Sequence, residues 1–196
     1  MNIVFDIGNV LIAWDPHAAF RHAFDSEAEI DAFLIDADFY AWNLEQDRGR
    51  TRQEAVAAVP AGHAALLDGY FDRFHLTIRD KIRETWSLME RLRSKGHAIY
   101  GLTNFAADTW PVALEVHPQL GDAFEDVVVS GHEGRIKPDR EIYDLLCRRN
   151  KLSPSDCLFI DDSAANAAGT RKAGWQAHHF TSPDALRRDL TERGLL

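Results

Sequence analysis

Short apolar runs, separated by stretches long enough for helices, are the feature that most constrains the fold of this chain. The runs do not alternate strictly with polar residues, which is typical of strands buried on both faces of a parallel sheet. From about residue 80 onward the stretches between them are amphipathic, so strands and helices alternate. The pattern predicts an α/β fold with a doubly wound, Rossmann-like parallel sheet. The predicted strands cover residues 3–5, 98–102, 127–130, 158–160 and 178–180.

Local signals predict where two of the helices begin or end. Apolar residues recur at three- and four-residue steps over 78–92, and Gly96 follows them as a helix stop. Ser182 and Pro183 supply an N-cap and a first-turn proline. A last helix should therefore run from there toward Arg193.

A long insertion without a convincing strand separates the first predicted strand from the second. Within it, Thr51 and Glu54 have the spacing of a capping box, which opens a helix. We therefore predict a helical cap subdomain over 15–80, inserted into an α/β core made of 1–14 and 81–196.

Composition excludes several classes of protein. The chain has 196 residues with 22 Lys and Arg against 31 Asp and Glu, a net charge of −9, which argues against a nucleic-acid partner. No apolar run approaches the roughly 18 residues that span a membrane, and no secretory signal is visible, so we expect a cytoplasmic protein. Cys147 and Cys157 have no metal-ligand spacing and are expected to be reduced, structural thiols. Nothing in the sequence determines the oligomeric state.

Four polar patches stand in order along the chain, and three of them directly follow predicted strands. Each alone has an ordinary explanation, because an Asp or Thr after a strand often caps a helix and a lone Lys is usually a surface charge. Together they would meet, since the carboxyl ends of neighbouring parallel strands form the crevice where ligands bind. The patches supply Asp6, then Thr103 with Asn104, then Lys137, and finally Asp161 with Asp162.

These side chains suit a phosphate site that contains a metal ion. The hydroxyl of Thr103 and the amide of Asn104 can donate hydrogen bonds to phosphate oxygens. Asp161 and Asp162 are costly to bring near a third carboxylate unless a cation neutralises them. Hard carboxylate oxygens with room for water suit Mg²⁺.

Four motifs stand in order along the chain: Phe5-Asp6-Ile7-Gly8-Asn9-Val10-Leu11, Leu102-Thr103-Asn104, Lys137-Pro138-Asp139, and Asp161-Asp162-Ser163 followed by Asn166. Through these motifs the chain resembles the haloacid dehalogenase-like hydrolases with a helical cap after the first strand, and the resemblance covers nearly its whole length. Through Trp14-Asp15-Pro16 and Arg48-Gly49-Arg50 it also resembles a branch of this family that includes glucose-1-phosphate phosphatases.

The resemblance implies a Mg²⁺-dependent phosphatase that acts on a small phosphorylated metabolite, such as a sugar phosphate and in particular an anomeric one. Asp6 would be the nucleophile that forms an aspartyl phosphate. Thr103 and Asn104 would hold the phosphoryl oxygens, and Lys137 would neutralise the charge on the nucleophile and the phosphate. The implied Mg²⁺ ligands are Asp6, the backbone carbonyl of Gly8, Asp161 and Asp162, with Asp162 favoured for direct ligation.

Gly8 departs from the pattern of the family. Most of its phosphatases carry a second Asp there, which acts as acid toward the leaving group and as base toward water. Such help is worth roughly 10²- to 10⁴-fold in rate. Either the substrate leaves well without protonation, as an anomeric, acyl or aryl phosphate would, or Asp15 or the cap residue His17 supplies the proton.

Two other functions stay open at this stage. A 2-haloacid dehalogenase also works without the second Asp, but it has no use for Asp161 and Asp162 beside its nucleophile. A non-catalytic protein that binds a phosphorylated metabolite is supported by Gly8 alone, whereas Gly8 argues against a phosphomutase. Candidate residues of the substrate-binding wall are Trp14, Trp42, Glu45 and Arg48.

Overall fold

Five parallel strands form one sheet in the computed structural model, which describes all 196 residues. The strand order is β3-β2-β1-β4-β5, so β1 is central and pairs with both β2 and β4. Asp6 directly follows β1 and therefore lies where the chain order reverses across the sheet, the usual ligand position in such folds. The strands are β1 (Asn2–Phe5), β2 (Ala98–Thr103), β3 (Val127–Val129), β4 (Cys157–Asp161) and β5 (Gln176–His179).

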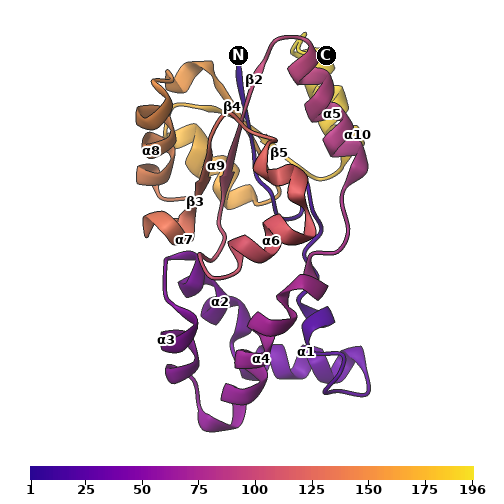
Figure 1. The fold of residues 1–196 in the computed structure, drawn as a ribbon. Coiled ribbons are helices and arrows are strands. Elements are labelled where there is room, and N and C mark those ends of the chain that lie inside the picture. The colour runs from indigo at the N-terminus through magenta and orange to yellow at the C-terminus, as the bar shows by residue number, and fades with distance from the viewer.

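The predicted fold class is confirmed, because helices cover both faces of this sheet (Figure 1). Neighbouring residues of β1 point to opposite faces: Ile3 and Phe5 belong to one hydrophobic cluster and Val4 to another. The first cluster contains apolar residues of α5 (Arg83–Ser94), α6 (Trp110–Val116) and α10 (Pro183–Glu192), and the second contains those of α8 (Arg140–Asn150). The remaining short elements of this half are α7 (Ser130–Glu133), α9 (Ala164–Lys172), η2 (Pro118–Gly121) and η3 (Pro154–Asp156).

The helix predicted over 78–92 is wrong at its beginning. α4 (Ala61–Thr77) ends before this stretch and α5 begins only at Arg83. Between the two helices the chain returns to the first motif: the amide of Ile82 donates to the carbonyl of Leu11, and Lys81 forms an isolated bridge with Ile12. Apolar residues of the connecting segment and of α5 pack against the same core, so together they have the spacing of a single helix. The stop at Gly96 is confirmed, with a φ of 86°.

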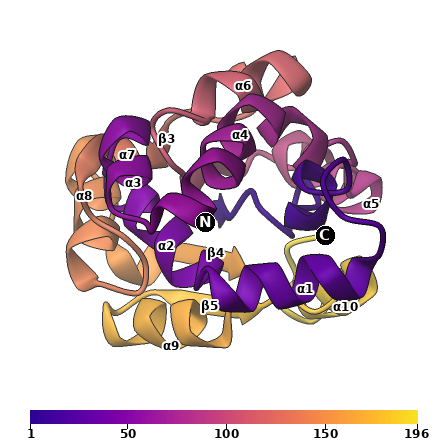
Figure 2. The same cartoon turned by 90° about the horizontal axis from the view of Figure 1, so that it is seen from below.

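Four helices of the predicted cap gather beyond the carboxyl ends of the strands (Figures 1 and 2). The predicted capping box is present: the amide of Glu54 donates to the hydroxyl of Thr51, and the amide of Thr51 donates to the carboxylate of Glu54. The division into a cap over 15–80 and a core over 1–14 and 81–196 stays a prediction. The elements of this part are η1 (Pro16–Ala19), α1 (Glu27–Asp36), α2 (Phe39–Asp47), α3 (Arg52–Ala57) and α4.

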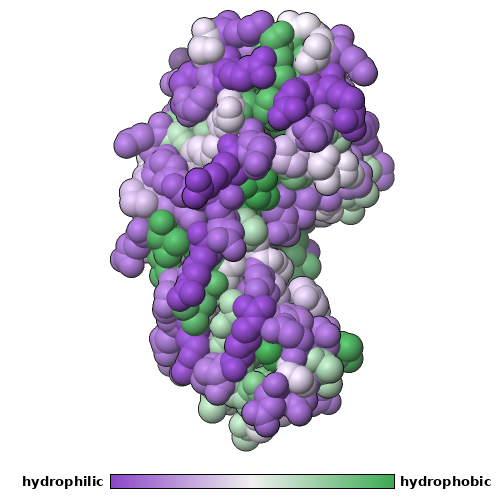
Figure 3. Space-filling view, turned by 90° about the vertical axis from the view of Figure 1, so that its right-hand side faces the viewer, coloured by the Kyte–Doolittle hydropathy of each residue, from purple (hydrophilic) through white to green (hydrophobic).

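One hydrophobic cluster runs from these helices into the sheet. It joins Phe5 of β1 to Phe20 and Trp42 of the helical part. Phe74 of α4 meets Phe105, which follows β2, with ring centroids 5.5 Å apart. Figure 3 shows a narrower waist between the two lobes, where apolar surface gathers. Because the shared aromatic packing spans the waist, it positions the helices over the strand ends.

Both cysteines are free and buried, as expected. Burial raises the pKa of the Cys157 thiol to about 12, so it stays protonated at neutral pH. None of the helices combines the length and apolarity that a membrane crossing requires.

Close packing at Gly169 predicts a stability difference between two glycine substitutions. A Cβ on Gly169 would lie 2.6 Å from Cβ and 2.7 Å from the carbonyl oxygen of Pro138, whereas a Cβ on Gly62 in α4 would meet nothing within 4 Å. We expect Gly169→Ala to lower the free energy of unfolding by about 1–3 kcal/mol and Gly62→Ala to raise it by about 0.4–1 kcal/mol. Urea denaturation of both variants measures this, and equal effects would contradict the packing account.

Candidate active site

Lys137 is buried between two carboxylates at the carboxyl edge of the sheet. Its Nζ lies 2.8 Å from Oδ1 of Asp6 and 2.7 Å from Oδ2 of Asp161, and it also donates to the carbonyl of Leu102. Only 2% of Lys137 and 6% of Asp6 is exposed to solvent. Burial alone would lower the pKa of Lys137, but the two carboxylates outweigh it and the pKa is raised. This lysine is therefore a permanent cation inside the site and not a surface charge.

Asn104 holds the backbone of Lys137 in place. Its Oδ1 accepts from the amide of Lys137 at 2.8 Å, and its Nδ2 donates to the carbonyl of Lys137 at 3.0 Å. Asn104 also lines the cavity described below, and its second amide hydrogen is not used by these bonds. The predicted contact between Asn104 and a phosphoryl oxygen stays a prediction, alongside this observed role in positioning Lys137.

Thr103 ends β2 with a buried hydroxyl that has no hydrogen-bond partner. Only 1% of the residue is exposed, and it is not itself among the residues that line the cavity. An unpaired buried hydroxyl costs about 1–3 kcal/mol, so an acceptor reaching it would be favoured. A phosphoryl oxygen is such an acceptor, which fits the role predicted for Thr103.

The adjacent acids Asp161 and Asp162 face different surroundings. Asp161 is fully buried and accepts hydrogen bonds from Lys137, from the amide of Ser163 and, through both oxygens, from Nδ2 of Asn166. Asp162 is only partly buried and lines the cavity. The structure therefore assigns Asp161 to the positioning of Lys137 and leaves Asp162 open to a ligand, while direct ligation by Asp161 stays a prediction.

The charges in this cluster fit a divalent cation. Carboxylate oxygens of Asp6, Asp161 and Asp162 lie within 4.8 Å of one another. The pKa of Asp6 is raised to about 8, mainly by burial, with a further contribution from the charge of Asp161 and against the opposing effect of Lys137. Burial, followed by the charge of Asp161, also raises the pKa of Asp162. Three carboxylates face one ammonium group, so a cation held by hard oxygen ligands such as Mg²⁺ would neutralise the excess charge.

The loop after Asp6 is open at Gly8. A Cβ at this position would meet nothing within 4 Å, and its φ lies outside the left-handed region. The turn is instead made by Asn9, whose φ is 55° and whose Oδ1 accepts from the amide of Trp14 at 3.0 Å. Because a Cβ has free space at Gly8, crowding around the backbone does not account for the missing acid.

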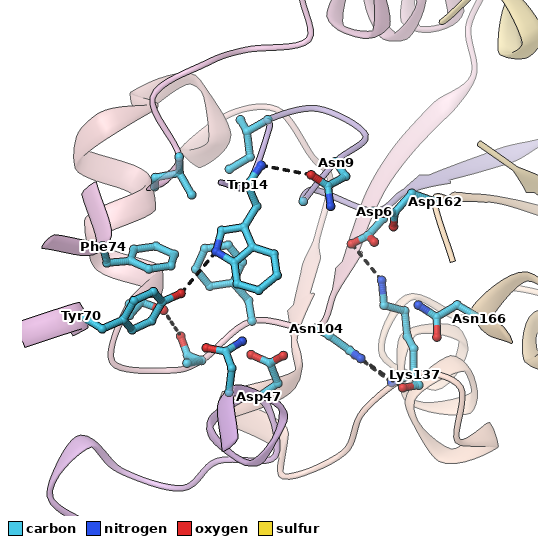
Figure 4. Close-up of a pocket in the computed structure, with 17 residues that line it drawn as sticks. Asp6, Asn9, Trp14, Asp47, Tyr70, Phe74, Asn104, Lys137, Asp162 and Asn166 are labelled. Carbon is cyan, nitrogen blue, oxygen red and sulfur yellow. Dashed lines mark hydrogen bonds and ion pairs between the residues drawn. The ribbon is translucent and has the colours of Figure 1, made fainter. Parts of the chain in front are cut away.

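A cavity of about 180 Å³ lies between the strand ends and the helical part (Figure 4). Its core side is polar and carries the charged cluster, whereas much of the rest is apolar. Such a mixture suits a small molecule with one anionic group. The lining residues are Asp6, Gly8, Asn9, Ile12, Trp14, Asn43, Asp47, Tyr70, Phe74, Ile78, Asn104, Phe105, Ala106, Thr109, Lys137, Asp162 and Asn166.

Of the four predicted wall residues, only Trp14 lines the cavity. Trp42 is a core residue whose Nε1 donates to the carbonyl of Ala55. Glu45 and Arg48 are exposed and pair with each other at 3.4 Å. These predictions were wrong because helical spacing does not say which face of α2 meets the strand ends.

Asp15 and His17, which were predicted as alternative proton donors in place of an acid at Gly8, also lie outside the cavity. Asp15 caps η1 through the amide of His17 and pairs with Arg21 at 2.9 Å. His17 pairs with Glu27. Both side chains are therefore engaged in local structure near the start of η1.

Asp47, the last residue of α2, is a cavity residue that the sequence analysis missed. It is 9% exposed, lines the cavity, and forms no hydrogen bond or ion pair with the protein through its side chain. Burial raises its pKa to about 7 against the opposing charge of Lys137. One available signal is its spacing from Asn43: residues four apart share a helix face, and Asn43 lines the cavity too.

Comparison with known proteins places the chain in a family. A model of the haloacid dehalogenase-like hydrolases matches residues 1–174. The sesquiterpene phosphatase astK of Aspergillus oryzae is 25% identical over 189 residues, which cover 96% of this chain and 94% of that protein. The D-ribitol-5-phosphate phosphatase of Bacteroides thetaiotaomicron is 24% identical over 208 residues, which cover 97% of this chain and 96% of that protein.

A solved structure is similar over most of the chain. A HAD family enzyme from Bacteroides thetaiotaomicron, in complex with magnesium and inorganic phosphate, superposes with a TM-score of 0.70 at 22% identity over 92% of this chain and 94% of that one. At this identity the likeness shows the fold. Because the family model covers most of the sequence, the chain belongs to the haloacid dehalogenase-like hydrolases, as the four motifs predicted.

The charged cluster predicts a cation-dependent gain in thermal stability. Mg²⁺ at a hundred times its dissociation constant should stabilise the wild type by about 2.7 kcal/mol. For a chain of this size, each kcal/mol of stabilisation raises Tm by about 2–4 °C. Asp162→Asn should lose this gain, and Glu45→Gln, which removes an exposed charge on α2, should keep it. Differential scanning calorimetry with and without Mg²⁺ measures the shift, and an undiminished shift in Asp162→Asn would contradict the assignment.

The raised pKa of Asp47 predicts a pH-dependent stability difference. Because the folded pKa of about 7 exceeds the ordinary aspartate pKa of 3.8, the contribution of Asp47 is fully present below the unfolded pKa and is lost as the pH rises through the folded pKa. Relative to Asp47→Asn, the wild type should lose up to about 4 kcal/mol of unfolding free energy between about pH 4 and about pH 8. Urea denaturation across this range tests it, and a constant difference would contradict the burial of an unpaired carboxyl.

Proposed function

We propose that this hydrolase is a Mg²⁺-dependent phosphatase that acts on a small phosphorylated metabolite through an aspartyl phosphate on Asp6. The observation that carries the proposal is the buried Lys137 between Asp6 and Asp161, with Asp162 open to the same cavity. This arrangement supplies a nucleophilic carboxylate, a fixed cation and free oxygen ligands within one crevice. Phosphoryl transfer requires little beyond such positioning and charge neutralisation.

Each residue has a separate task in the proposed reaction. Nζ of Lys137 contacts Oδ1 of Asp6. The other carboxylate oxygen, Oδ2, is therefore available to attack phosphorus. Lys137 neutralises the charge that builds between the nucleophile and the phosphoryl group. The hydroxyl of Thr103 and the remaining amide hydrogen of Asn104 donate to phosphoryl oxygens. Asp161 and Asn104 act on Lys137 and position it.

Three groups are proposed to hold Mg²⁺: the carboxylates of Asp6 and Asp162 and the backbone carbonyl of Gly8. The ion would neutralise the repulsion between the anionic substrate and the carboxylates. Asp161 stays in the predicted ligand set, although its four hydrogen bonds favour a positioning role.

For the substrate, we propose a phosphate ester whose leaving group has an apolar face. Trp14, Phe74 and Phe105 supply apolar walls, while Asn43 and Asp47 supply polar groups on α2. An anomeric sugar phosphate and an aryl phosphate both combine such a face with a good leaving group, which suits the missing acid at Gly8. The phosphatases named among the relatives act, by their names, on a sesquiterpene compound and on a sugar alcohol phosphate, which supports a small phosphate ester as the substrate class.

The panel that tests the function compares glucose 1-phosphate, glucose 6-phosphate and phenyl phosphate, each with Mg²⁺ and with a chelator. We expect Mg²⁺-dependent release of phosphate, fastest from the anomeric and aryl esters. Asp6→Asn should lower the rate at least about 10³-fold because it removes the nucleophile, while Glu45→Gln should keep it.

Two outcomes separate this function from the other candidates. Release of halide from a 2-haloacid, without any release of phosphate, would contradict the proposal in favour of a dehalogenase. Binding of phosphate and Mg²⁺ without turnover of any ester would contradict it in favour of a non-catalytic binding protein.

A further inference from the structure

The proposed chemistry leaves one buried carboxyl in the cavity without a task. Asp47 ends α2, is 9% exposed, and has no partner in the protein. Its carboxylate oxygens are not among the fully enclosed polar atoms, so they are reached from the cavity that the residue lines. Because Asp47 lines the substrate cavity, a bound substrate can form a hydrogen bond with its carboxyl group.

The direction of phosphoryl transfer determines which part of the substrate meets Asp47. The attacking and leaving oxygens lie roughly in line on opposite sides of phosphorus. Asp6 attacks from the core side, where Lys137 and Asp162 also lie, so the leaving oxygen points toward the helical part. Figure 4 shows Asp47 on that side, across the open space from Asp6.

No other acid stands on the leaving-group side. Gly8 has no side chain, and Asp15 and His17 do not line the cavity. The hydroxyl of Tyr70 accepts from Nε1 of Trp14 at 3.3 Å, and burial raises its pKa well above the usual range, so it is a weak proton donor. Asp47 is the one group in this region that can exchange a proton at neutral pH.

Few charges act on Asp47. Lys137 faces it from the core and Tyr70 faces it from α4. His132 on α7 is exposed. The other charged groups on helices that pack against α2 have partners: Glu27 with Arg21, Glu29 with the amide of Asp25, Asp31 with His17, Asp36 with His63, Arg52 with Asp68 and Asp72, Glu54 with Thr51, Arg73 with the carbonyl of Gly69, His75 with the carbonyl of Asp72, and Glu133 with Arg149.

We propose that Asp47 is the general acid and base of the reaction and takes the role that Gly8 leaves vacant, an inference that rests on the proposed phosphatase function. As Asp6 bonds to phosphorus, the bond from phosphorus to the leaving oxygen breaks and protonated Asp47 gives its proton to that oxygen. Asp47 then takes a proton from the water that attacks the aspartyl phosphate. The bond to Asp6 breaks, inorganic phosphate leaves, and Asp47 is protonated again.

Burial supports both halves of this cycle. It raises the pKa of Asp47 to about 7. A group with a pKa near the working pH can give and take a proton with similar ease. The cap then contributes directly to the chemistry as well as excluding water.

The dependence on the leaving group tests this role through kcat/KM, which reports the step up to phosphoryl transfer to Asp6. For Asp47→Asn, we expect kcat/KM for an alkyl phosphate to fall roughly 10²- to 10⁴-fold, and kcat/KM for 4-nitrophenyl phosphate, whose leaving group needs no proton, to change by less than about tenfold. The variant should also release a burst of one equivalent of nitrophenol, because hydrolysis of the aspartyl phosphate still needs the base. Glu45→Gln, with the same charge change on the same helix, should resemble the wild type.

A second pair of variants guards against an effect of the substitution on folding. Asp47→Leu keeps the branching at Cγ, removes the ionisable group and should show the same selective loss. The double variant Gly8→Asp with Asp47→Asn should have a kcat/KM for the alkyl phosphate about tenfold or more above that of Asp47→Asn alone. Position 8 has room for a side chain, since a Cβ there meets nothing within 4 Å.

The outcomes distinguish this inference from the function on which it rests. An equal loss for the alkyl and nitrophenyl esters, or the absence of a burst, would overturn the role of Asp47 while phosphatase activity stands. No Mg²⁺-dependent release from either ester by the wild type would overturn the proposed function itself.

Discussion

The burial of one ammonium group is the constraint on which the rest of the site depends. Moving Lys137 out of water costs several kcal/mol, and only close, well-placed carboxylates offset such a cost. Asp6 and Asp161 lie 2.8 and 2.7 Å from its Nζ because they end neighbouring parallel strands, β1 and β4. Sheet order therefore determines the electrostatics of the site. The same arrangement leaves Asp162 as the acid that is free to bind a ligand.

The core and the helical part divide the proposed reaction between them. In the proposed reaction the strand ends would act on the phosphoryl unit, whereas Phe74 of α4 and Asp47 of α2 would face the leaving group. A continuous hydrophobic cluster connects the two parts: Phe74 packs α4 against Phe105 at the strand ends, and Trp42 packs α2 against Tyr70 of α4. This packing links the stability of the fold to the geometry of proton transfer.

Much of this arrangement could be predicted from sequence, because buried parallel strands and the polar residues that follow them are local patterns. Asp6, Thr103 with Asn104, and the acid pair were predicted in this way, whereas Lys137 was predicted from its place in the ordered series of patches. The different surroundings of Asp161 and Asp162 could not be, because they depend on donors contributed from distant segments. Asp47 was missed for the same reason: its burial and its place in the cavity result from tertiary packing of α2. The apolar spacing over 78–92 gave a wrong helix start because the segment before α5 and α5 itself pack against the same hydrophobic core.

The site of phosphorylation is the most direct test of the central claim, that the carboxylate held beside Lys137 is a nucleophile. The measurement is peptide mass spectrometry of protein quenched in acid during turnover of a nitrophenyl phosphate with Mg²⁺. The account predicts a phosphoryl group on the peptide that contains Asp6 and on no other. Turnover with an unmodified Asp6, or with phosphate attached to a different residue, would contradict it.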